Sequence, residues 1–497
     1  MSLKKALVNR FDGGLAETKY PDRKNQAADM QHCDIFTDPR LLKNQRKNER
    51  ETDQSSSYEF YVYDGVRRSD GKIIGVGYTS AASSAARFYR KNNDDVSSYW
   101  QQSSVTAGNT PYYNGAISYK DSVYCLSYSG TSNYLYRYDG DATATSVVSS
   151  FTESTGTGSR IPKPIMHPQD SKLYIAIGKT VFVWDGSAGT VTSGITTPYS
   201  IVGISHWGTY VALACVDGQG RSIVYLWGRD TTITTFQEVI SFGDDRIVLL
   251  ANLNGVLIGV STKSTSATFL DAKIIVRGYV GGTPKILKQW FSTDFVYLYG
   301  YYFVWKDVLY FLDSNNTPQV FAFGFNKDGE PVLSKDRTTN YEGEVSATCY
   351  HFFNIHDYFF FANVTGRLNR TYGGQAPLYN TQDSIYTFPI NVDVALEDQA
   401  KIKKLHSVYV RCYANSYSGG TSYGTIKLEY SVDGGSYTTV FNEASPVNKS
   451  NFVIEALGDL NGDALGEGRD IQFRLTFDQG VDIAEFGYKY ETVETTI

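Results

Sequence analysis

The stretch from Lys172 to Gly186 reads KLYIAIGKTVFVWDG, and residues 210–230 read YVALACVDGQGRSIVYLWGRD. Each stretch contains two runs of apolar, β-branched or aromatic residues joined by a turn that includes glycine, a pattern that predicts a β-hairpin. Each also ends in tryptophan with an aspartate close behind it. The two stretches are therefore interpreted as successive copies of one all-β unit.

The same pattern recurs along most of the chain. An aromatic residue followed by Asp-Gly closes the runs at 63–65 and 138–140. Further pairs of apolar runs lie at 123–126 with 134–138, 255–260 with 272–276, and 308–312 with 319–323. Asp139, Asp185 and Asp230 are spaced by about 45 residues, within the ~40–50 residues of a four-stranded propeller blade. Residues 55–375 are therefore predicted to form a β-propeller of about seven blades, with roughly six to eight compatible with the spacing.

The composition favours an all-β fold. Among 497 residues there are 39 tyrosines, 27 phenylalanines and 45 glycines but only 3 methionines, a balance typical of sheets with many turns. A continuous apolar run such as 247–251 is expected to be an inner strand buried on both faces. The formal net charge of −6 argues against sequence-specific nucleic-acid binding, which depends on neutralising phosphates.

The five cysteines at 33, 125, 215, 349 and 412 are far apart and form no Cys-x-x-Cys pair. This spacing predicts buried free thiols made in a reducing cytoplasm rather than a disulfide framework or zinc site. The N-terminus lacks the apolar run of a secretion signal, and no segment approaches the ~18 apolar residues of a membrane span. The chain is accordingly expected to span no membrane.

Residues 1–54 differ from the rest. They are polar, with the highly charged segment NQRKNERET at 44–52, and contain too little apolar sequence for a core of their own. They are expected to form an extended arm with one short helix near Gln26–Cys33. The arm would be ordered by contact with another surface.

The arm also carries a resemblance. Phe11, Gly13, Gly14 and Leu15 are followed by the phrase from Ala28 to Ile35, which includes Asp29 and Met30, and then by Leu41 and Leu42 before Lys43. This order resembles the opening of tailed-bacteriophage virion proteins, which often continue into a β-propeller and serve in the tail or neck. The resemblance implies that these residues form an assembly arm.

A linker near 375–383 is followed by a separate module at 384–497. Alternating strand patterns at 425–432 and 471–477 predict strands with one wet and one buried face, as in a β-sandwich. The turn at Ser431–Tyr437 and the strand at 468–474 resemble the jelly-roll-like domains that follow propellers in phage tail proteins.

One loop of this module has a candidate calcium pattern. Asp459, Asn461 and Asp463 place oxygen ligands at alternating positions, with Glu467 and Asp470 further on. Ala464 stands where a calcium loop needs glycine, so a polar, glycine-rich loop between two strands explains the same residues. No other cofactor is indicated by the sequence.

The recurring carboxylates allow two interpretations. Asp64, Asp139, Asp185 and Asp230 follow the blade period, so they could form a ring of glycosidase-like acids at a central pocket. An aspartate before glycine at the end of a strand also makes a turn by accepting backbone N–H bonds, and this is the favoured interpretation. No nucleophile elbow or His-Glu-x-x-His motif occurs.

These observations predict a structural virion protein rather than an enzyme. The expected role is in the tail of a tailed bacteriophage, as nozzle, tail tip or neck, in attachment or genome delivery. The expected partners are copies of the same chain in a homo-oligomeric ring and other virion tail proteins, after synthesis in the host cytoplasm. One alternative is a carbohydrate- or receptor-binding tail protein that stacks a host surface glycan on tyrosines such as Tyr112–Tyr113 or Tyr299–Tyr302. The other is a propeller enzyme that degrades glycans.

Overall fold

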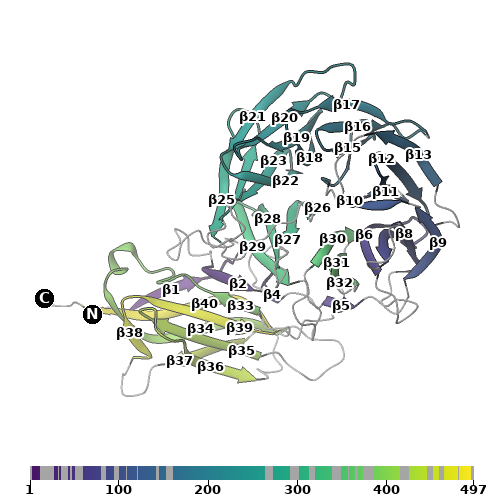
Figure 1. Ribbon diagram of the computed structural model, residues 1–497. Coiled ribbons are helices and arrows are strands. Elements are labelled where there is room, and N and C mark those ends of the chain that lie inside the picture. The colour runs from purple at the N-terminus through teal and green to yellow at the C-terminus, as the bar shows by residue number, and fades with distance from the viewer. Residues whose placement is uncertain are drawn as a thin grey trace. The chain divides into compact units, whose positions relative to one another are not determined.

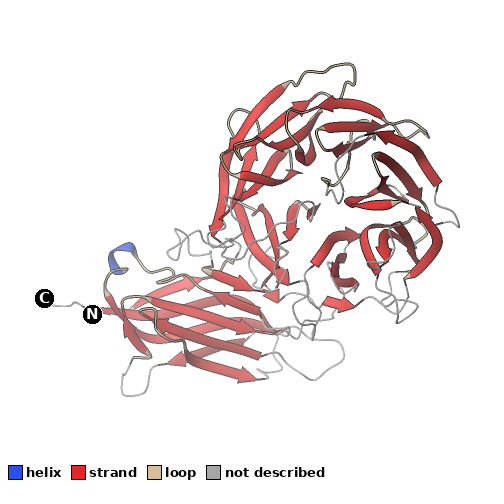
Figure 2. Cartoon of the chain, in the orientation of Figure 1, coloured by secondary structure: helices blue, strands red, loops and turns tan. Residues whose placement is uncertain are grey.

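The computed structural model describes residues 3–11, 27–31, 33–34, 43–44, 48–50, 60–79, 86–93, 100–107, 109–119, 121–140, 145–152, 161–187, 189–262, 273–291, 302–312, 319–338, 349–355, 358–363, 368–372, 384–414, 425–444, 452–457, 464–478 and 481–493. Strands make up nearly all of the regular structure in these ranges (Figure 2). The one helix among them is the 3₁₀ turn η1 at Leu396–Asp398. The prediction of an all-β chain is confirmed.

Seven of the sheets in the described ranges contain four strands. The first three comprise β6 (Phe60–Arg67), β7 (Ile73–Thr79), β8 (Ala86–Lys91) and β9 (Gln101–Ala107); β10 (Thr110–Tyr119), β11 (Ser122–Ser129), β12 (Ser132–Tyr138) and β13 (Thr145–Thr152); and β14 (Ile165–Met166), β15 (Leu173–Ile177), β16 (Thr180–Trp184) and β17 (Thr192–Thr196). The next three comprise β18 (Ile201–Trp207), β19 (Tyr210–Val216), β20 (Ser222–Trp227) and β21 (Glu238–Gly243); β22 (Arg246–Leu253), β23 (Val256–Thr262), β24 (Lys273–Tyr279) and β25 (Lys285–Phe291); and β26 (Tyr302–Trp305), β27 (Val308–Leu312), β28 (Gln319–Phe325) and β29 (Pro331–Thr338). Each of these six sheets follows the chain order, as expected for propeller-like repetition of one unit.

The seventh four-stranded sheet departs from chain order. It contains β30 (Cys349–Ile355), β31 (Tyr358–Asn363) and β32 (Leu368–Tyr372), and its fourth strand is β5 (Asn48–Arg50) from near the N-terminus. β5 pairs antiparallel with β32, with Glu49 opposite Arg370. The segment before the first full sheet therefore completes the last one, and β30 also contacts β6 of that first sheet.

The chain divides into two compact units. One, called the terminal unit here, contains residues 1–47, 320–338 and 375–497, and the other, called the repeat unit, contains residues 48–319 and 339–374. The expected boundaries at 54 and 55 thus differ from the structure, because β5 at Asn48–Arg50 lies in the repeat unit.

The apolar core of the repeat unit lies between successive sheets rather than within one sheet. One cluster joins Leu126 and Leu135 to Ile175 and Phe182 of the following sheet. Similar clusters lie at other junctions, and the one around Trp100 and Phe360 joins the first sheet to the sheet completed by β5. Figure 1 shows the sheets of this unit following one another around a common centre. Rings and branched side chains suit these junctions because they bury a large area between flat sheets.

The terminal unit contains two five-stranded sheets. One has the order β1 (Lys4–Val8), β40 (Val481–Val493), β34 (Ile402–Ala414) and β37 (Phe452–Leu457), with β38 (Gly466–Gly468) also paired to β34. The other has the order β2 (Asp29–Gln31), β33 (Ser384–Thr387), β39 (Ile471–Phe477), β35 (Thr425–Val432) and β36 (Thr438–Ala444). Their inward residues meet in an aromatic core, where the ring of Phe486 stacks on Phe388 and meets Phe473 edge-on. The unit's described strands also include the two-stranded pair of β3 (Cys33–Asp34) with β4 (Lys43–Asn44). Residues 320–338, which hold β29 and all but the first residue of β28, fall in this unit as well, so the predicted propeller range of 55–375 does not coincide with the repeat unit.

The N-terminal segment is not the expected arm with a helix near Gln26–Cys33. Residues Asp29–Gln31 and Cys33–Asp34 are strands, and β2 pairs with β33 through Met30 and Tyr386. The error has a physical cause, since a strand three residues long is stabilised by a partner more than 350 residues away and leaves no local pattern. β1 and β2 thus add one N-terminal strand to each C-terminal sheet.

Two further predictions from the sequence concern the cysteine side chains and membrane-spanning segments. Cys33, Cys125, Cys215 and Cys412 are buried free thiols, as predicted for them. Within the described ranges, no helix has the length and apolar character needed to cross a bilayer.

Candidate functional site

Two of the recurring aspartates have the predicted turn role. Asp185 accepts a hydrogen bond from the Ser187 amide at 2.9 Å, and Asp230 accepts one from the Thr232 amide at 2.9 Å and one from its hydroxyl at 2.7 Å. The side-chain and backbone hydrogen bonds of these neighbours lower the pKa of both carboxyls. A carboxylate that caps its own turn is ionised and engaged, so it is poorly suited to act as a general acid.

Asp64 has a different environment from the turn aspartates. It lies within β6 beside a bulge, is 2% exposed, and accepts hydrogen bonds from the amides of Gly65 at 2.9 Å and Ser118 at 3.1 Å. The ammonium of Lys163 lies 3.1 Å from its carboxylate. Asp64 therefore links the first strands of two sheets to the segment that leads into the third. Asp139, by contrast, lies half-exposed, 3.9 Å from Arg137.

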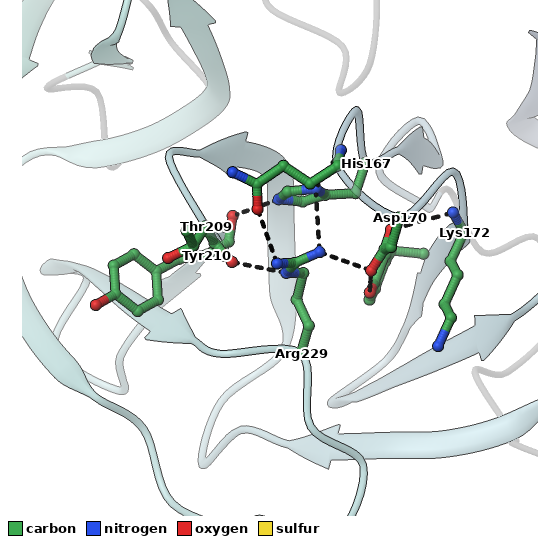
Figure 3. A network of polar contacts seen from close by, with 8 residues as sticks. His167, Asp170, Lys172, Thr209, Tyr210 and Arg229 are labelled. Atoms are coloured by element: carbon green, nitrogen blue, oxygen red, sulfur yellow. Dashed lines mark hydrogen bonds and ion pairs between the residues drawn. The ribbon is translucent and has the colours of Figure 1, made fainter.

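A cluster of polar contacts in the repeat unit surrounds Arg229, which follows β20 (Figure 3). Its guanidinium donates to the Asp170 carboxylate at 2.7 Å, to the Gln169 side-chain oxygen at 2.9 Å and to the Thr209 carbonyl at 2.6 Å. The first two partners lie in the turn between β14 and β15, and Thr209 lies between β18 and β19. Arg229 thus joins the third and fourth four-stranded sheets.

Arg229 also adopts an unusual backbone conformation. Its φ is +71°, in the left-handed region that non-glycine residues adopt at a cost of about 1–2 kcal/mol. Three charge-assisted or carbonyl hydrogen bonds offset this cost, because each contributes on the order of 1 kcal/mol or more. The hydrogen bonds of the Arg229 side chain therefore hold its backbone in this strained conformation.

His167 completes the cluster and is fully buried. One ring nitrogen lies 3.3 Å from the Tyr210 carbonyl, and the other lies 3.3 Å from the Gln169 amide and 3.4 Å from Arg229 (Figure 3). Burial lowers the pKa of His167, and the positive charge of Arg229 lowers it further. The imidazole is consequently neutral near pH 7, and without exposed surface it has no access for a substrate.

The acid of the cluster is Asp170. Burial on its own would raise the pKa of Asp170, but hydrogen bonds from the Tyr174 hydroxyl and the Lys172 amide, together with Arg229, keep the pKa below its ordinary value. Burial and the hydrogen bond to Asp170 raise the pKa of Tyr174. This is an ion pair with neutral hydrogen-bonding neighbours, an arrangement that fixes two sheets together.

The terminal unit has its own buried cation, the ammonium of Lys403. It is fully buried and donates to the carbonyls of Gln399 at 3.0 Å, Lys401 at 2.8 Å and Arg469 at 2.5 Å. Burial lowers the pKa of Lys403, while the nearby Asp470 and two further aspartates oppose the shift. A lysine thus supplies the positive charge among backbone carbonyls that a metal ion could otherwise supply.

The calcium candidate is adjacent to this region in sequence. Asp459, Asn461 and Asp463 lie outside the described residues. Glu467, which belongs to the same pattern, lies 3.9 Å from Lys404. In the part of the chain that the structure describes, no three acidic, histidine or cysteine side chains form a metal-binding group.

The predicted assembly residues fall into three groups. Phe11 and Met30 are fully buried, and the ring of Phe11 meets Tyr386 edge-on at 5.7 Å. Asp29 lies in β2, where its backbone pairs with Thr387. The remaining residues, Gly13, Gly14, Leu15, Ile35, Leu41 and Leu42, lie outside the described residues.

Two of the tyrosines proposed to stack sugars, Tyr112 and Tyr302, are used inside the fold. Tyr112 is 2% exposed and donates to Asn133, and Tyr302 donates to the Leu250 carbonyl at 2.9 Å. Burial raises the pKa of Tyr302. Residues 299–301 lie outside the described ranges.

The sequence predicts neither the Arg229 cluster nor the Lys403 cage, which is the Lys403 ammonium with the carbonyls of Gln399, Lys401 and Arg469. His167 is one of six histidines scattered along the sequence, and Lys403 lies in a strand-like run at 401–405. A partial signal for the first was the position of Arg229 between Trp227 and Asp230 at the end of a repeat. The carbonyl partners of Lys403 leave no trace in the sequence.

Comparisons with known proteins identify no family. No family model matches the chain, and no curated protein matches it. Solved structures that match the chain include virginiamycin B lyase from Staphylococcus aureus, with a TM-score of 0.43 and 9% identity over 66% of this chain and 99% of that one. They also include the C-terminal WD40 domain of Sif2, with a TM-score of 0.40 and 9% identity over 66% of this chain and all of that one. The designed Ika8 protein matches with a TM-score of 0.35 and 10% identity over 65% of this chain and all of that one. At these scores the similarity assigns no function.

Proposed function

We propose that the seven four-stranded sheets are the blades of a seven-bladed β-propeller closed by β5, and that the two five-stranded sheets form a jelly-roll-like β-sandwich. The blade count is supported by the order of the sheets and by the apolar clusters between neighbours, including the cluster between the first and last. The sandwich is supported by the shared core of Phe388, Phe473 and Phe486.

The function proposed for this architecture is that of a structural virion protein in the tail of a tailed bacteriophage. It would form a homo-oligomeric ring as nozzle, tail tip or neck, in contact with other tail proteins. The resemblance of the N-terminal phrase suggests this class. The chain would act as a rigid scaffold in attachment or genome delivery rather than as an enzyme.

The observation that carries the proposal is how the buried charges are used. Asp64 with Lys163, Asp170 with Arg229, and Lys403 with its carbonyls all join separate segments of one unit. A catalytic centre needs perturbed groups that a substrate can reach. These groups instead stabilise the relative positions of strands, as expected for a protein that bears load.

The oligomeric mass of the protein and its presence in virions test the proposal. Light scattering of the full-length protein should give a multiple of the 55.4 kDa chain, and mass spectrometry of purified virions should find the chain in the tail. A monomer at high concentration, or virions that lack the chain, would contradict the proposal. A truncation of residues 1–54 is not a clean test, because it removes β1, β2 and β5.

Neither alternative has comparable support among the described residues. The glycan-binding alternative named Tyr112 and Tyr302, whose hydroxyls donate inside the fold. The glycan-degrading alternative named Asp185 and Asp230, whose carboxylates cap turns. A glycan array and an activity screen on the purified protein would reopen either one.

A further inference from the structure

The first sheet of the terminal unit has two edges, β1 and β37. Both carry exposed apolar side chains: Leu3, just before β1, is 57% exposed, while Val453 and Leu457 of β37 are 53% and 65% exposed. An exposed edge strand with apolar side chains is a template for pairing with another chain. Natural proteins usually protect such edges, so these two need an explanation.

The exposed residues of both edges lie on the same face of the sheet. Lys5 pairs with Lys489 on β40, and Tyr409 of β34 pairs both with Gly487 on β40 and with Glu455 on β37. Contacts across the face agree with this register. The ammonium of Lys5 lies over the Tyr409 ring at 5.2 Å, and Lys489 lies 3.8 Å from Glu455.

The space above Gly487 shows how closely this face is packed. A Cβ at Gly487 would come within 2.5 Å of the Tyr409 ring, so glycine lets the ring lie flat across the strand. The hydroxyl of Tyr409 donates to Glu485 at 2.8 Å. The middle of the face is thus internally satisfied, and the exposed apolar residues lie at its two edges.

The two edges are complementary in sequence. Along β1 the face presents Leu3, Lys5 and Leu7, and along β37 it presents Val453, Glu455 and Leu457. Both read apolar, charged, apolar, with opposite charges at the centre. An antiparallel pairing that sets Lys5 opposite Glu455 also sets Leu3 opposite Leu457 and Leu7 opposite Val453. Opposite charges and apolar pairs directly across a ladder each contribute roughly 0.2–1 kcal/mol.

Strand direction fits a ring. Each strand in the order β1, β40, β34, β37 is antiparallel to the next, so β37 runs opposite to β1. Rotation about an axis close to the strand direction preserves their directions, so β37 of one copy meets β1 of the next copy antiparallel. Within one copy Lys5 is level with Leu457, so setting Lys5 opposite Glu455 shifts the next copy by two residues along the strand. Such a heterologous contact closes into a ring when the strands are tilted relative to the ring axis, as they are in a barrel. A two-fold β37–β37 contact in the matching register would instead place Glu455 opposite itself, which is repulsive.

The edge strand β1 is held in place from its own unit. Its Leu7 amide donates to the Asp393 carboxylate at 2.7 Å, and Lys4 pairs with the buried Asp398. Because Asp393 occupies the Leu7 amide, backbone pairing with a neighbour falls on the Leu3–Lys5 half of the strand. Leu7 then contributes a side-chain contact only.

We propose that β37 of one copy pairs antiparallel with β1 of the next copy, with Glu455 opposite Lys5, so that the first sheet of the terminal unit continues from copy to copy around the ring. The partner is thus a second copy of this chain. The inference rests on the proposed function, because it supplies the contact of the proposed homo-oligomer.

A cysteine pair tests the contact directly. Within one copy, Lys5 and Glu455 are separated by three strand spacings, about 14 Å across the sheet, and by a further two residues along the strands. A disulfide requires Cα atoms within roughly 7 Å, so the double variant Lys5→Cys/Glu455→Cys cannot form one within a chain at these positions. On oxidation of the assembled full-length protein, we expect a ladder of covalent multimers on a non-reducing denaturing gel. The matched control, Lys5→Cys/Asp244→Cys, pairs the same edge with an exposed position on the repeat unit and should stay monomeric on the gel.

Charge reversal provides the second test. Glu455→Lys or Lys5→Glu should lower the mass seen by light scattering, and the double reversal should restore it. The matched control for Glu455→Lys is Asp244→Lys, which makes the same charge change elsewhere and should not lower the mass. Circular dichroism verifies that each variant is folded.

The outcomes separate the inference from the function on which it rests. If the wild-type protein is a ring but the cysteine pair gives no ladder and the reversals leave the mass unchanged, the edge contact is wrong and the ring stands. If the wild-type protein is a monomer under all conditions, both the ring and its contact are overturned.

Discussion

Arg229 shows how one side chain can fix two sheets of the repeat unit. Its guanidinium contacts the turn that holds Asp170 and Gln169 and also the Thr209 carbonyl of the next sheet, while its own backbone is in the left-handed region. The side chains of Asp170 and Arg229 are 24% and 16% exposed. The pair is therefore worth more than a surface ion pair, which contributes about 0–1 kcal/mol, and less than a fully buried one.

Removing the charge of Asp170 should therefore destabilise the repeat unit. We expect Asp170→Asn to lower the free energy of unfolding by about 2 kcal/mol, because it leaves a partly buried guanidinium without its counter-ion. Trp227 is a local probe, since its ring lies 6.1 Å from that of Tyr174, which contacts Asp170. Denaturant unfolding followed by tryptophan fluorescence measures the change. Asp185→Asn, at an exposed turn, should cost less than about 1 kcal/mol, and equal losses in the two variants would contradict this role for Asp170.

His167 predicts a pH dependence. Burial and Arg229 lower its pKa in the folded protein, so below its ordinary value of about 6.5 the unfolded chain binds a proton that the folded chain does not. Stability should therefore decrease as the pH falls through about 6.5. Asp170 loses its charge only at lower pH, because its own pKa is lowered. His206, whose pKa burial also lowers, is present in both proteins compared. Unfolding of the wild type and His167→Gln between about pH 7.5 and 5 should show a difference that changes with pH, and a constant difference would refute the assignment.

Lys403 gives a third residue-level prediction, in the terminal unit. Lys403→Met keeps the length of the side chain but removes the donor of the Lys401 and Arg469 carbonyls, whereas the Gln399 carbonyl keeps the side-chain amide of Asn391 at 3.4 Å. Each carbonyl that stays unsatisfied costs roughly 1–3 kcal/mol. We expect a loss of about 3 kcal/mol after partial rehydration. Lys404→Met is the matched control, since Lys404 is half-exposed and lies 3.9 Å from Glu467. Thermal unfolding of both variants measures the difference, and similar midpoints would show that the cage is hydrated.

At the level of strands, the sequence predicts the hairpins and misses the long-range additions. The pairing of 255–260 with 272–276 is confirmed by the register of Val260 with Val276, and the apolar run at 247–251 lies in β22, the first strand of its sheet. These elements carry their own pattern of alternation and turns. β2 and β5 do not, because each is three residues long and pairs with a strand more than 300 residues away. The same limit applies to the candidate site. The partners of Lys403 are backbone carbonyls, which every residue has, so no sequence pattern predicts them.

The strand β5 should act as the closure of the repeat unit. Asn48 and Thr371 lie opposite each other on β5 and β32, so the double variant Asn48→Cys/Thr371→Cys can form a cross-strand disulfide that closes a very long loop. Such a bond should raise the free energy of unfolding by about 2–4 kcal/mol by restricting the unfolded chain. The same protein after reduction is its own control in denaturant unfolding. If oxidation forms the bond without shifting the midpoint, β5 separates from β32 only after the rest of the unit has unfolded.

For the whole molecule, net charge and the proposed edge contact would make opposing contributions to the proposed assembly. Each copy carries a formal charge of −6, so neighbouring copies repel, whereas the single pair of Lys5 with Glu455 is partly exposed and contributes at most about 1 kcal/mol. Raising the ionic strength from about 0.01 to 0.15 M shortens the screening length from about 30 to 8 Å, which weakens the long-range repulsion more than the close contact. We therefore expect the fraction of assembled protein, measured by light scattering at fixed concentration, to increase with salt. Asp244→Lys and Glu455→Lys each change the formal charge from −6 by two units, to −4, yet the first should assemble at lower salt than the wild type and the second should not assemble. Assembly that weakens with salt, or two variants that behave alike, would show that bulk charge rather than the strand edge governs the ring.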